Sequence, residues 1–344
     1  LRLASSPADT LLWRNHVIPR VAGTHFRPED QRFPSRQVDV FSEIRRRPPG
    51  HTFVGLTPRR SAFGWRWDPV YLSERQRTTH RHVLGKTGSG KTESVLWPQV
   101  LQDVLDGKGC VVISGKGGDE EVATIKGIAQ VAGREADLRV FALPAWNQPA
   151  LPSHTYNMVW VEPRTPESAG GDPVAVAERV FSVLPLGDNR YYNTQAQIMF
   201  TNLCRLLHGI VDARGLGQPF TMRDLAVCLK GVGNKNPAWQ KALDHCLERS
   251  RDQEAAREIA SQGDRLGHEI HKALSGLVGA VDKFQAPLVN SYTPDIVMRE
   301  VLERNLIVYV QLPSNLFKIQ APSLGKVFLM DVQPVRSVTL GGVA

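Results

Sequence analysis

Long hydrophobic runs are missing from this sequence. No run of about 18 consecutive apolar residues, the length typical of a transmembrane helix, occurs in the 344-residue chain. The first residues also lack the charged and apolar regions of a signal peptide. The sequence therefore predicts no transmembrane helix within this chain. Because the first residue is Leu1 and not Met, we expect the chain to be a fragment whose upstream part has been removed.

Cysteine is scarce and scattered, and the usual metal-binding spacings are absent. The four cysteines are Cys110, Cys204, Cys228 and Cys246. None belongs to a C-x-x-C pair, which argues against a zinc ribbon or a dithiol redox motif. Cys110 lies in an apolar run and Cys204 in a helical pattern, so both are expected to be buried thiols in a reducing compartment. The segment that begins at His268 also lacks the H-E-x-x-H motif of a metalloprotease.

Acidic residues are outnumbered by basic ones. The 42 Lys and Arg against 34 Asp and Glu give a net charge of +8. Such a charge permits contact with nucleic acid or with an anionic membrane surface, and it is equally compatible with an ordinary soluble basic protein. The run Arg45-Arg46-Arg47 is a candidate contact for phosphates or lipid headgroups, with a solvated surface as the alternative.

The central feature is a stretch that fits the pattern G-x-x-x-x-G-K-[ST], the phosphate-binding loop of nucleoside triphosphatases. Its glycines let backbone N–H groups surround a polyphosphate, and Lys91 can reach the β and γ phosphates. The Thr92 hydroxyl is suited to Mg²⁺ bound through ATP, and Glu93 follows directly. The predicted nucleotide-binding residues are Gly85, Lys86, Thr87, Gly88, Ser89, Gly90, Lys91, Thr92 and Glu93.

The context of this loop predicts a parallel strand–helix–strand unit. His82-Val83-Leu84 is expected to end a strand, and Val100, Leu101, Val104 and Leu105 have the spacing of a helix face. A second strand is expected over 109–114. It is followed by Lys116 and Asp119, which we expect near the phosphate loop because ligands gather at the carboxyl ends of parallel strands.

The rest of the chain divides into further strands and a helical region. Residues 52–56 and 63–67 are expected to pair as a hairpin, and 138–143 and 306–313 to form buried strands. Helical patterns cover 38–44, 120–131, 174–184 and almost all of 193–281. Thr221 and Asp224 have the spacing of a capping box, and Asn236-Pro237 is a typical helix start.

An acidic residue that could hold magnesium is hard to find. Such a residue usually ends an apolar strand, and a second carboxylate commonly follows it. The run Val327-Phe328-Leu329-Met330-Asp331 fits superficially, but the next residue is Val332. The same run also reads as a helix. Asp331 is therefore a weak catalytic candidate, and Asp119 a weaker one.

Taken together, these motifs resemble the coupling ATPases of type IV secretion and conjugation, in the FtsK–HerA superfamily of pumping motors. Besides the phosphate loop, the resemblance rests on stretches spread over about residues 80–335. They are Val111-Val112-Ile113-Ser114-Gly115-Lys116-Gly117-Gly118-Asp119, Gly133-Arg134-Glu135-Ala136-Asp137-Leu138, Thr155-Tyr156-Asn157, Ile307-Val308-Tyr309-Val310-Gln311-Leu312-Pro313 and Leu324-Gly325-Lys326.

The resemblance implies an α/β fold: a RecA-like P-loop domain with a parallel sheet and an inserted all-α domain. The nucleotide-binding domain would comprise 81–190 and 288–344, the insertion 191–287, and residues 1–80 would be an N-terminal arm after a missing membrane anchor. It further implies ATP and Mg²⁺ as cofactors and ring hexamers at the cytoplasmic face of the bacterial inner membrane. The implied partners are secretion-channel components and a relaxase–DNA complex or protein effectors.

The sequence departs from the family pattern at two further places. Ser114 stands where the family has Asp before Gly-Lys-Gly, and the family's Asp-Glu strand follows the helix that carries Leu324-Gly325-Lys326. By that comparison Asp331 is not the magnesium ligand, and the ligand is expected beyond Ala344.

Two alternative functions stay open: a DNA translocase or helicase of the same superfamily outside secretion, and an adaptor that binds nucleotide without hydrolysing it. The predicted helical insertion has no aromatic ladder that would indicate single-stranded DNA as cargo.

Overall fold

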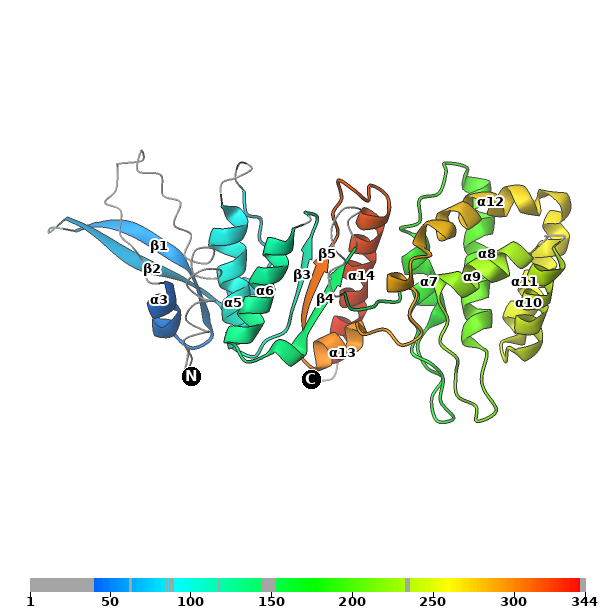
Figure 1. Cartoon of the computed structure of the whole chain (residues 1–344), viewed down its shortest axis with the longest axis horizontal. Helices are drawn as coiled ribbons and strands as arrows, with labels where there is room; N and C mark the ends of the chain where they lie inside the picture. The colour runs from blue at the N-terminus through cyan, green and yellow to red at the C-terminus, as the bar shows by residue number, and fades with distance from the viewer. Residues whose placement is uncertain are drawn as a thin grey trace. The chain divides into compact units, whose positions relative to one another are not determined.

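The fold is a mixture of helices with a small parallel sheet and a separate hairpin (Figure 1). The computed structural model describes residues 40–61, 64–84, 86, 90–116, 118–143, 153–232 and 236–340. The chain divides into two compact units. One holds residues 1–111, 118–138 and 304–309, and the other holds 112–117, 139–303 and 310–344.

The first unit contains the predicted hairpin. Strand β1 (His51–Ser61) pairs antiparallel with β2 (Gly64–Ser73), from His51 opposite Ser73 to Ser61 opposite Gly64, with an irregularity between Phe53 and Gly55. A short helix, α3 (Val40–Arg46), precedes the hairpin, where the sequence predicted one. Helix α4 (Glu74–Arg77) follows, and Ser73 and Gln76 cap it reciprocally. The hairpin expected from alternating apolar residues is confirmed.

Helix α5 (Trp97–Leu105) continues directly from a π-helical turn over Thr92–Leu96. The helix face predicted from residue spacing is the buried one, because Val100, Leu101 and Val104 are all in the core. Pro98 is the second residue of α5, and because it has no N–H it cannot donate a hydrogen bond back to the π-helical turn that precedes it. The helix expected after the phosphate loop is therefore confirmed.

Three parallel strands form the sheet, in the order β3 (Cys110–Ser114), β5 (Ile307–Gln311) and β4 (Leu138–Ala142). Helix α6 (Asp119–Val131) connects β3 to β4, in agreement with the helix expected over 120–131 and the strand expected over 138–143. All residues of the central strand β5 are buried, which explains its unbroken apolar sequence. Each strand lies within one of the three segments from which a strand was expected.

One predicted strand is missing. Residues 80–84 belong to no helix or strand, and Val83 and Leu84 are 49% and 89% exposed. The expectation of a strand ending at His82-Val83-Leu84 was therefore wrong. Three residues provide few ladder hydrogen bonds, and the polar residues before them add no apolar surface to bury.

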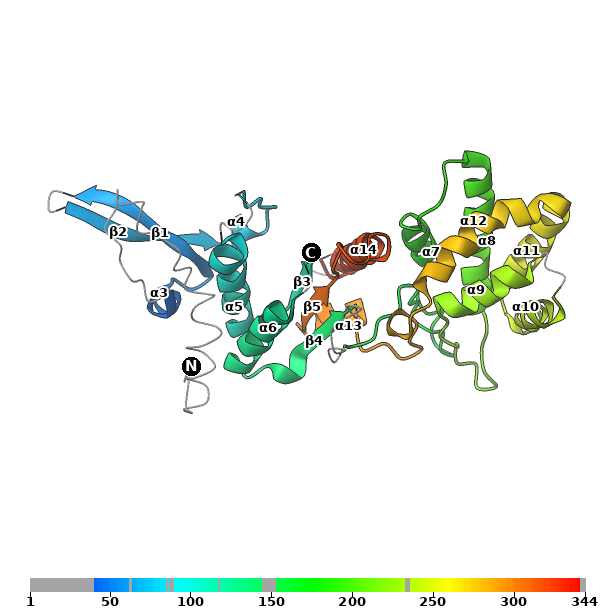
Figure 2. The ribbon, with the colours of Figure 1, turned by 45° about the horizontal axis from the view of Figure 1, so that its top comes forward.

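The second unit contains a group of helices built around α8 (Arg190–His208), as Figures 1 and 2 show. Helix α8 packs against its neighbours, which are α7 (Pro173–Phe181), α9 (Met222–Gly231), α10 (Pro237–Arg249), α11 (Gln253–Leu266) and α12 (Ile270–Val281). Side chains at the N-caps begin most of them, including the predicted Thr221–Asp224 capping box and Asn236 before α10. The helical pattern over 193–281 is thus confirmed.

Helices α13 (Met298–Glu303) and α14 (Gln320–Leu340) flank β5 in the sequence. Helix α14 decides between the two interpretations of residues 327–331, because Leu324, Val327 and Phe328 are buried while Leu329 is 58% exposed. That spacing is helical, so the interpretation as a strand ending in Asp331 was wrong. Among the described residues, no helix combines the length and the apolar character needed to cross a bilayer.

Gly109, just before β3, lies against the backbone that leads into β5. A Cβ atom there would be 2.7 Å from the carbonyl carbon and 2.8 Å from the Cα atom of Asn305, itself in the left-handed region at φ 54°. Because backbone cannot yield cheaply, Gly109→Ala should lower the free energy of unfolding by about 1–3 kcal/mol in urea titrations. In the exposed middle of α12, Gly276 has open space around it. Gly276→Ala should therefore stabilise by about 0.4–1 kcal/mol, and equal effects of the two variants would contradict the prediction.

Candidate functional site

The structure describes the end of the predicted phosphate loop and one residue of its beginning. Lys86 and Gly90 to Glu93 are described, whereas Gly85, Thr87, Gly88 and Ser89 lie outside the described residues. The site is therefore built from the two ends of the loop and from the helix that follows it.

Lys91 spans the loop from its end to its beginning. Its Nζ atom donates a hydrogen bond of 2.8 Å to the carbonyl oxygen of Lys86. The preceding residue, Gly90, has φ +74°, a conformation that residues with a Cβ atom rarely adopt. The carbonyl of Gly90 accepts hydrogen bonds from the N–H (2.8 Å) and the Oγ atom (2.6 Å) of Ser94. The ammonium group of Lys91 is thus held beside Lys86, a residue of the predicted phosphate loop.

The helix after the loop begins at this point. The π-helical turn over Thr92–Leu96 joins α5, so the N-terminal end of almost four turns of helix lies at Lys91 and Thr92. Free N–H groups and the helix dipole make such an end attractive to anions. Thr92 and Glu93 are half-buried in this first turn. Single π turns inside helices are frequent at functional sites.

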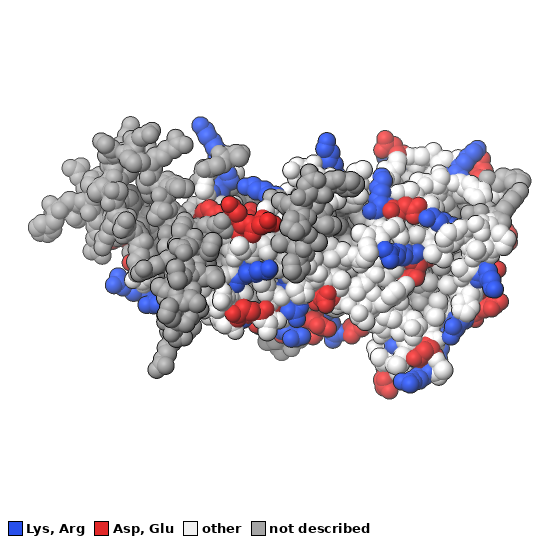
Figure 3. All heavy atoms as spheres, in the orientation of Figure 1, with Lys and Arg blue, Asp and Glu red and all other residues white. Residues whose placement is uncertain are grey.

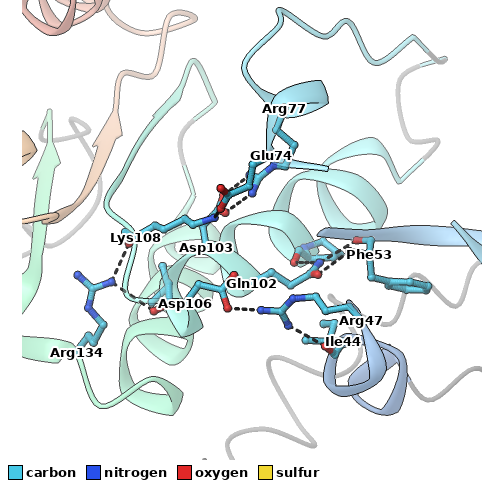
Figure 4. Close-up of polar contacts among 12 residues, drawn as sticks. Ile44, Arg47, Phe53, Glu74, Arg77, Gln102, Asp103, Asp106, Lys108 and Arg134 are labelled. Carbon is cyan, nitrogen blue, oxygen red and sulfur yellow. Dashed lines mark hydrogen bonds and ion pairs between the residues drawn. The ribbon is translucent and has the colours of Figure 1, made fainter. Parts of the chain in front are cut away.

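Helix α5 is fixed to β1 through a buried glutamine (Figure 4). The side chain of Gln102 accepts a 2.8 Å hydrogen bond from the N–H of Phe53 and donates a 2.9 Å bond to its carbonyl oxygen. The amide group of Gln102 thus pairs with the N–H and the carbonyl of Phe53, as the backbone of a neighbouring strand would. A buried amide is tolerated here because its polar atoms are paired.

Charged pairs hold the rest of α5 and the turn after it, as Figure 4 also shows. Arg77 forms two 2.5 Å hydrogen bonds with Asp103, and this partner raises the pKa of Arg77. Arg47 pairs with Asp106. Arg134 donates to the carbonyl oxygens of Val104 (3.3 Å) and Lys108 (2.8 Å). These contacts fix the helix whose N-terminal end carries Lys91 and Thr92.

The carboxyl edge of the sheet carries the second group of predicted residues. After β3 ends, the Gly115 carbonyl accepts hydrogen bonds from the N–H (3.1 Å) and the Oγ atom (3.0 Å) of Ser314, which follows β5. Lys116 is exposed at this edge, and Asp119 is the exposed first residue of α6. The two strand ends meet as parallel strands should. The proximity of Lys116 and Asp119 to the phosphate loop stays a prediction.

Gln311 is the last residue of β5 and belongs to the stretch 307–313 that supports the family resemblance. Its side chain is 3% exposed, and its Oε1 atom has no hydrogen-bond partner. A buried acceptor without a partner costs about 1–3 kcal/mol, which is unusual enough to mark a position for a ligand. The only signal in the sequence was a polar residue ending an apolar strand.

Asp331 is engaged with two other side chains. Its carboxylate accepts a hydrogen bond from the hydroxyl of Tyr156 and pairs with Arg179 of α7. Burial raises the pKa of the Asp331 carboxyl, while Arg179 and the Tyr156 hydroxyl act in the opposite direction. Tyr156 itself is buried and stacks on Phe328 with ring centroids 4.1 Å apart. Its pKa is raised by burial and by Asp331.

The residues beside Tyr156 also have structural partners. Thr155 donates to the Asp295 carboxylate through its N–H and its hydroxyl, each at 2.7 Å. Asn157 is buried and donates from Nδ2 to the carbonyl oxygens of Phe220 (2.8 Å) and Ser291 (3.2 Å). The stretch Thr155-Tyr156-Asn157, singled out in the sequence, thus joins segments that precede and follow the helices α8–α12.

The described residues fit the phosphates of a nucleotide better than they fit a complete magnesium site. Lys91 and the helix end supply positive charge, and Thr92 supplies a hydroxyl. A magnesium site also needs oxygen ligands such as carboxylates. The Asp331 carboxylate is occupied by Tyr156 and Arg179, and the described part of the chain contains no cluster of three or more potential metal ligands.

Comparison with known families identifies the chain. The model of the family described as "Type IV secretory system Conjugative DNA transfer" matches residues 42–340, which is most of the chain. Among curated proteins, none matches the sequence. The chain therefore belongs to the type IV secretory system conjugative DNA transfer family, and the resemblance seen in its motifs is confirmed.

Proposed function

We propose that this family member is the ATP-binding motor portion of a coupling protein, which recruits DNA or protein substrate and delivers it to the secretion channel. The observation that carries the proposal is the geometry at the phosphate loop. Lys91 turns back to the Lys86 carbonyl, and a well-anchored helix begins at the next residue. That arrangement is suited to a polyphosphate.

In this proposal the chain has a RecA-like nucleotide-binding domain made of 81–190 and 288–344. The segment 191–287 is an all-helical insertion, and 1–80 is an N-terminal arm that follows a membrane anchor. The parallel order β3-β5-β4 and the crossover helix α6 support the nucleotide-binding part. Bound ATP would supply a transferable phosphoryl group, with Lys91 holding the phosphates and Thr92 positioned for Mg²⁺. At or near the carboxyl edge of the sheet, further contacts with the nucleotide would come from Lys116, Asp119 and Gln311.

We further propose that Asp331 does not hold the magnesium ion. Its partners Tyr156 and Arg179 already use the carboxylate, and it lies on a helix and not at a strand end. Asp331 instead joins α14 to α7 and to the segment around Tyr156. The magnesium carboxylate would then come from elsewhere in the protein.

The assembly proposed from the family is a ring hexamer at the cytoplasmic face of the bacterial inner membrane, in contact with channel components and a relaxase–DNA complex or protein effectors. Charge alone does not identify the cargo. On the face drawn in Figure 3, basic side chains are interspersed with acidic ones, although the net charge is +8. Electrostatic attraction to phosphates usually needs basic residues clustered on one face.

The second candidate is an adaptor that binds nucleotide without hydrolysing it, which fits the engagement of Asp331 if no other carboxylate takes its place. The test is to measure Mg·ATP binding and hydrolysis by the 1–344 chain in parallel, with and without double-stranded DNA. We expect saturable ATP binding with turnover well below the roughly 1–10³ s⁻¹ typical of enzymes. Turnover within that range would exclude the adaptor and require a magnesium carboxylate within this chain. Absence of ATP binding would contradict the proposal as a whole.

A further inference from the structure

Two of the four cysteines lie side by side in the helical part of the second unit. The Sγ atoms of Cys228 on α9 and Cys246 on α10 are 3.9 Å apart, and both thiols are free. Cys228 is 1% exposed and Cys246 is half-buried. The two residues are 18 positions apart in the sequence. The two thiols therefore meet because two helices pack together, and not because they belong to one short sequence motif.

The packing of α9 against α10 explains why the thiols touch. Gly231 lies so close to α10 that a Cβ atom would be 2.6 Å from the Trp239 carbonyl oxygen and 2.8 Å from the Leu243 Cβ atom. Trp239, Leu243 and Cys246 follow one another at the spacing of a single helix face. Because α9 and α10 approach at Gly231, their next contact along this face brings Cys228 and Cys246 together. The distance between the thiols is thus set by the fold.

A cavity gives small molecules access to this pair. Its volume is about 190 Å³, and both cysteines line it together with Phe220, Val227, Ala242 and Tyr292. The wall is mainly apolar, and the Tyr292 hydroxyl donates a 2.8 Å hydrogen bond to Asp224 at its edge. A reagent of a few heavy atoms can therefore reach Cys246 while the protein stays folded.

The two thiols are not equivalent. The thiol of Cys228 donates a hydrogen bond to the sulfur of Cys246, which lowers the pKa of Cys246. The same bond and burial raise the pKa of Cys228. Because the thiolate is the reactive form, Cys246 is the thiol that reacts first. Cys110 and Cys204 lack this advantage, since burial raises the pKa of each of them.

We propose that Cys228 and Cys246 form a thiol-modification site, which exchanges with a low-molecular-weight disulfide and closes to an internal disulfide between α9 and α10. The Cys246 thiolate attacks one sulfur of the disulfide R–S–S–R, and a mixed disulfide forms as R–S⁻ leaves. Cys228 then loses its proton and attacks the Sγ atom of Cys246, and a second R–S⁻ leaves. The protein loses two protons and two electrons, and the small disulfide is reduced to two thiols.

Closure needs only local movement. The sulfur atoms must approach from 3.9 Å to about 2.05 Å, the length of a disulfide bond. Rotation about the Cα–Cβ bonds and a small shift of α10 can supply the difference. The product would tie α9 to α10 beside the cavity, and the proposal does not depend on nucleotide binding.

The experiment uses the complete 1–344 chain and bis(2-hydroxyethyl) disulfide, a small reagent suited to the cavity, as the probe. After incubation under native conditions, free thiols are counted in denaturant and cross-linked peptides are identified by mass spectrometry. We expect the count to fall from four thiols to two, with one cross-link joining Cys228 to Cys246. A count that stays at four, or a cross-link that involves Cys110 or Cys204, would overturn the proposal without any variant being needed.

Single variants test the order of the two steps. Cys228→Ser should stop at a mixed disulfide on Cys246, seen as the added mass of one hydroxyethylthio group. Cys246→Ser should retain its three thiols. Cys110→Ser is the matched control and should still lose two of its three thiols. Equal labelling of Cys228→Ser and Cys246→Ser would show that Cys246 has no special role and would contradict the mechanism.

Discussion

Lys91→Ala is expected to remove ATP binding by the chain. The Lys91 ammonium donates a hydrogen bond of 2.8 Å to the Lys86 carbonyl. In the complex it would exchange this neutral acceptor for charged phosphate oxygens. Hydrogen bonds between charged groups contribute about 1.5–3 kcal/mol each, so losing two of them weakens binding by about a hundredfold or more. Titration with a fluorescent ATP analogue should therefore show no saturation at concentrations that saturate the unsubstituted chain.

The matched control for Lys91→Ala is Lys126→Ala. Lys126 is exposed on α6, so the variant also removes one positive charge but should leave the ATP affinity within about threefold of the original. Ligand-induced stabilisation provides a second measurement. Mg·ATP at a hundred times its dissociation constant should stabilise a binding-competent chain by about 2.7 kcal/mol, and Lys91→Ala by almost nothing. An unchanged affinity for Lys91→Ala would show that the phosphate loop is not the nucleotide site.

The elements that were predicted correctly from the sequence are marked either by a continuous apolar run or by local capping residues. The strand over 306–313 was expected because its apolar run indicates burial, and β5 is fully buried at the centre of the sheet. Helix starts were predicted from capping chemistry, which is local and independent of tertiary packing. Asn236 and the Thr221–Asp224 box behave as expected for that reason.

The failures occur where the signal was short or ambiguous. Val83 and Leu84 are apolar but too few to form a strand without neighbours on both sides, and both are exposed. The run 327–331 contains apolar residues at every position but the last, so periodicity could not separate a strand from a buried helix. The burial of Val327 and Phe328 beside the exposed Leu329 makes the helix clear, and Phe328 packs against Phe141 and Tyr156, which are far away in the sequence.

Contacts between distant residues left no trace in the sequence. Tyr156 and Asp331 are separated by 175 positions, and nothing near either residue indicates the other. The buried Gln311 and the thiol pair have the same origin, since each depends on which elements pack together. The phosphate loop could be predicted because its chemistry is contained in consecutive residues, whereas the partners of Asp331 had to be found in the structure.

Removing Arg179 is expected to destabilise the protein strongly. Arg179 and Asp331 are both 12% exposed, so Arg179→Met would leave a buried carboxylate with only the Tyr156 hydroxyl as a partner. Breaking a buried pair from one side typically costs about 3–5 kcal/mol, because the remaining charge is uncompensated. Urea unfolding at neutral pH should show this loss. Arg257→Met, at an exposed position of α11, should change the free energy of unfolding by less than about 0.5 kcal/mol.

The loss in Arg179→Met should shrink when the carboxylate can be neutralised. Burial already raises the pKa of Asp331, and Arg179 is one of the two groups that oppose this rise, so the pKa should rise further in the variant. A raised folded-state pKa favours the folded state below the unfolded pKa of about 3.9, and the benefit disappears as the pH increases through the folded-state value. The difference between Arg179→Met and Arg257→Met should therefore be smaller at pH 5 than at pH 8. The double variant Arg179→Met/Asp331→Asn should recover much of the loss at pH 8, because an amide needs no counter-charge. If the double variant is no more stable than Arg179→Met at pH 8, the cost does not come from the Asp331 charge.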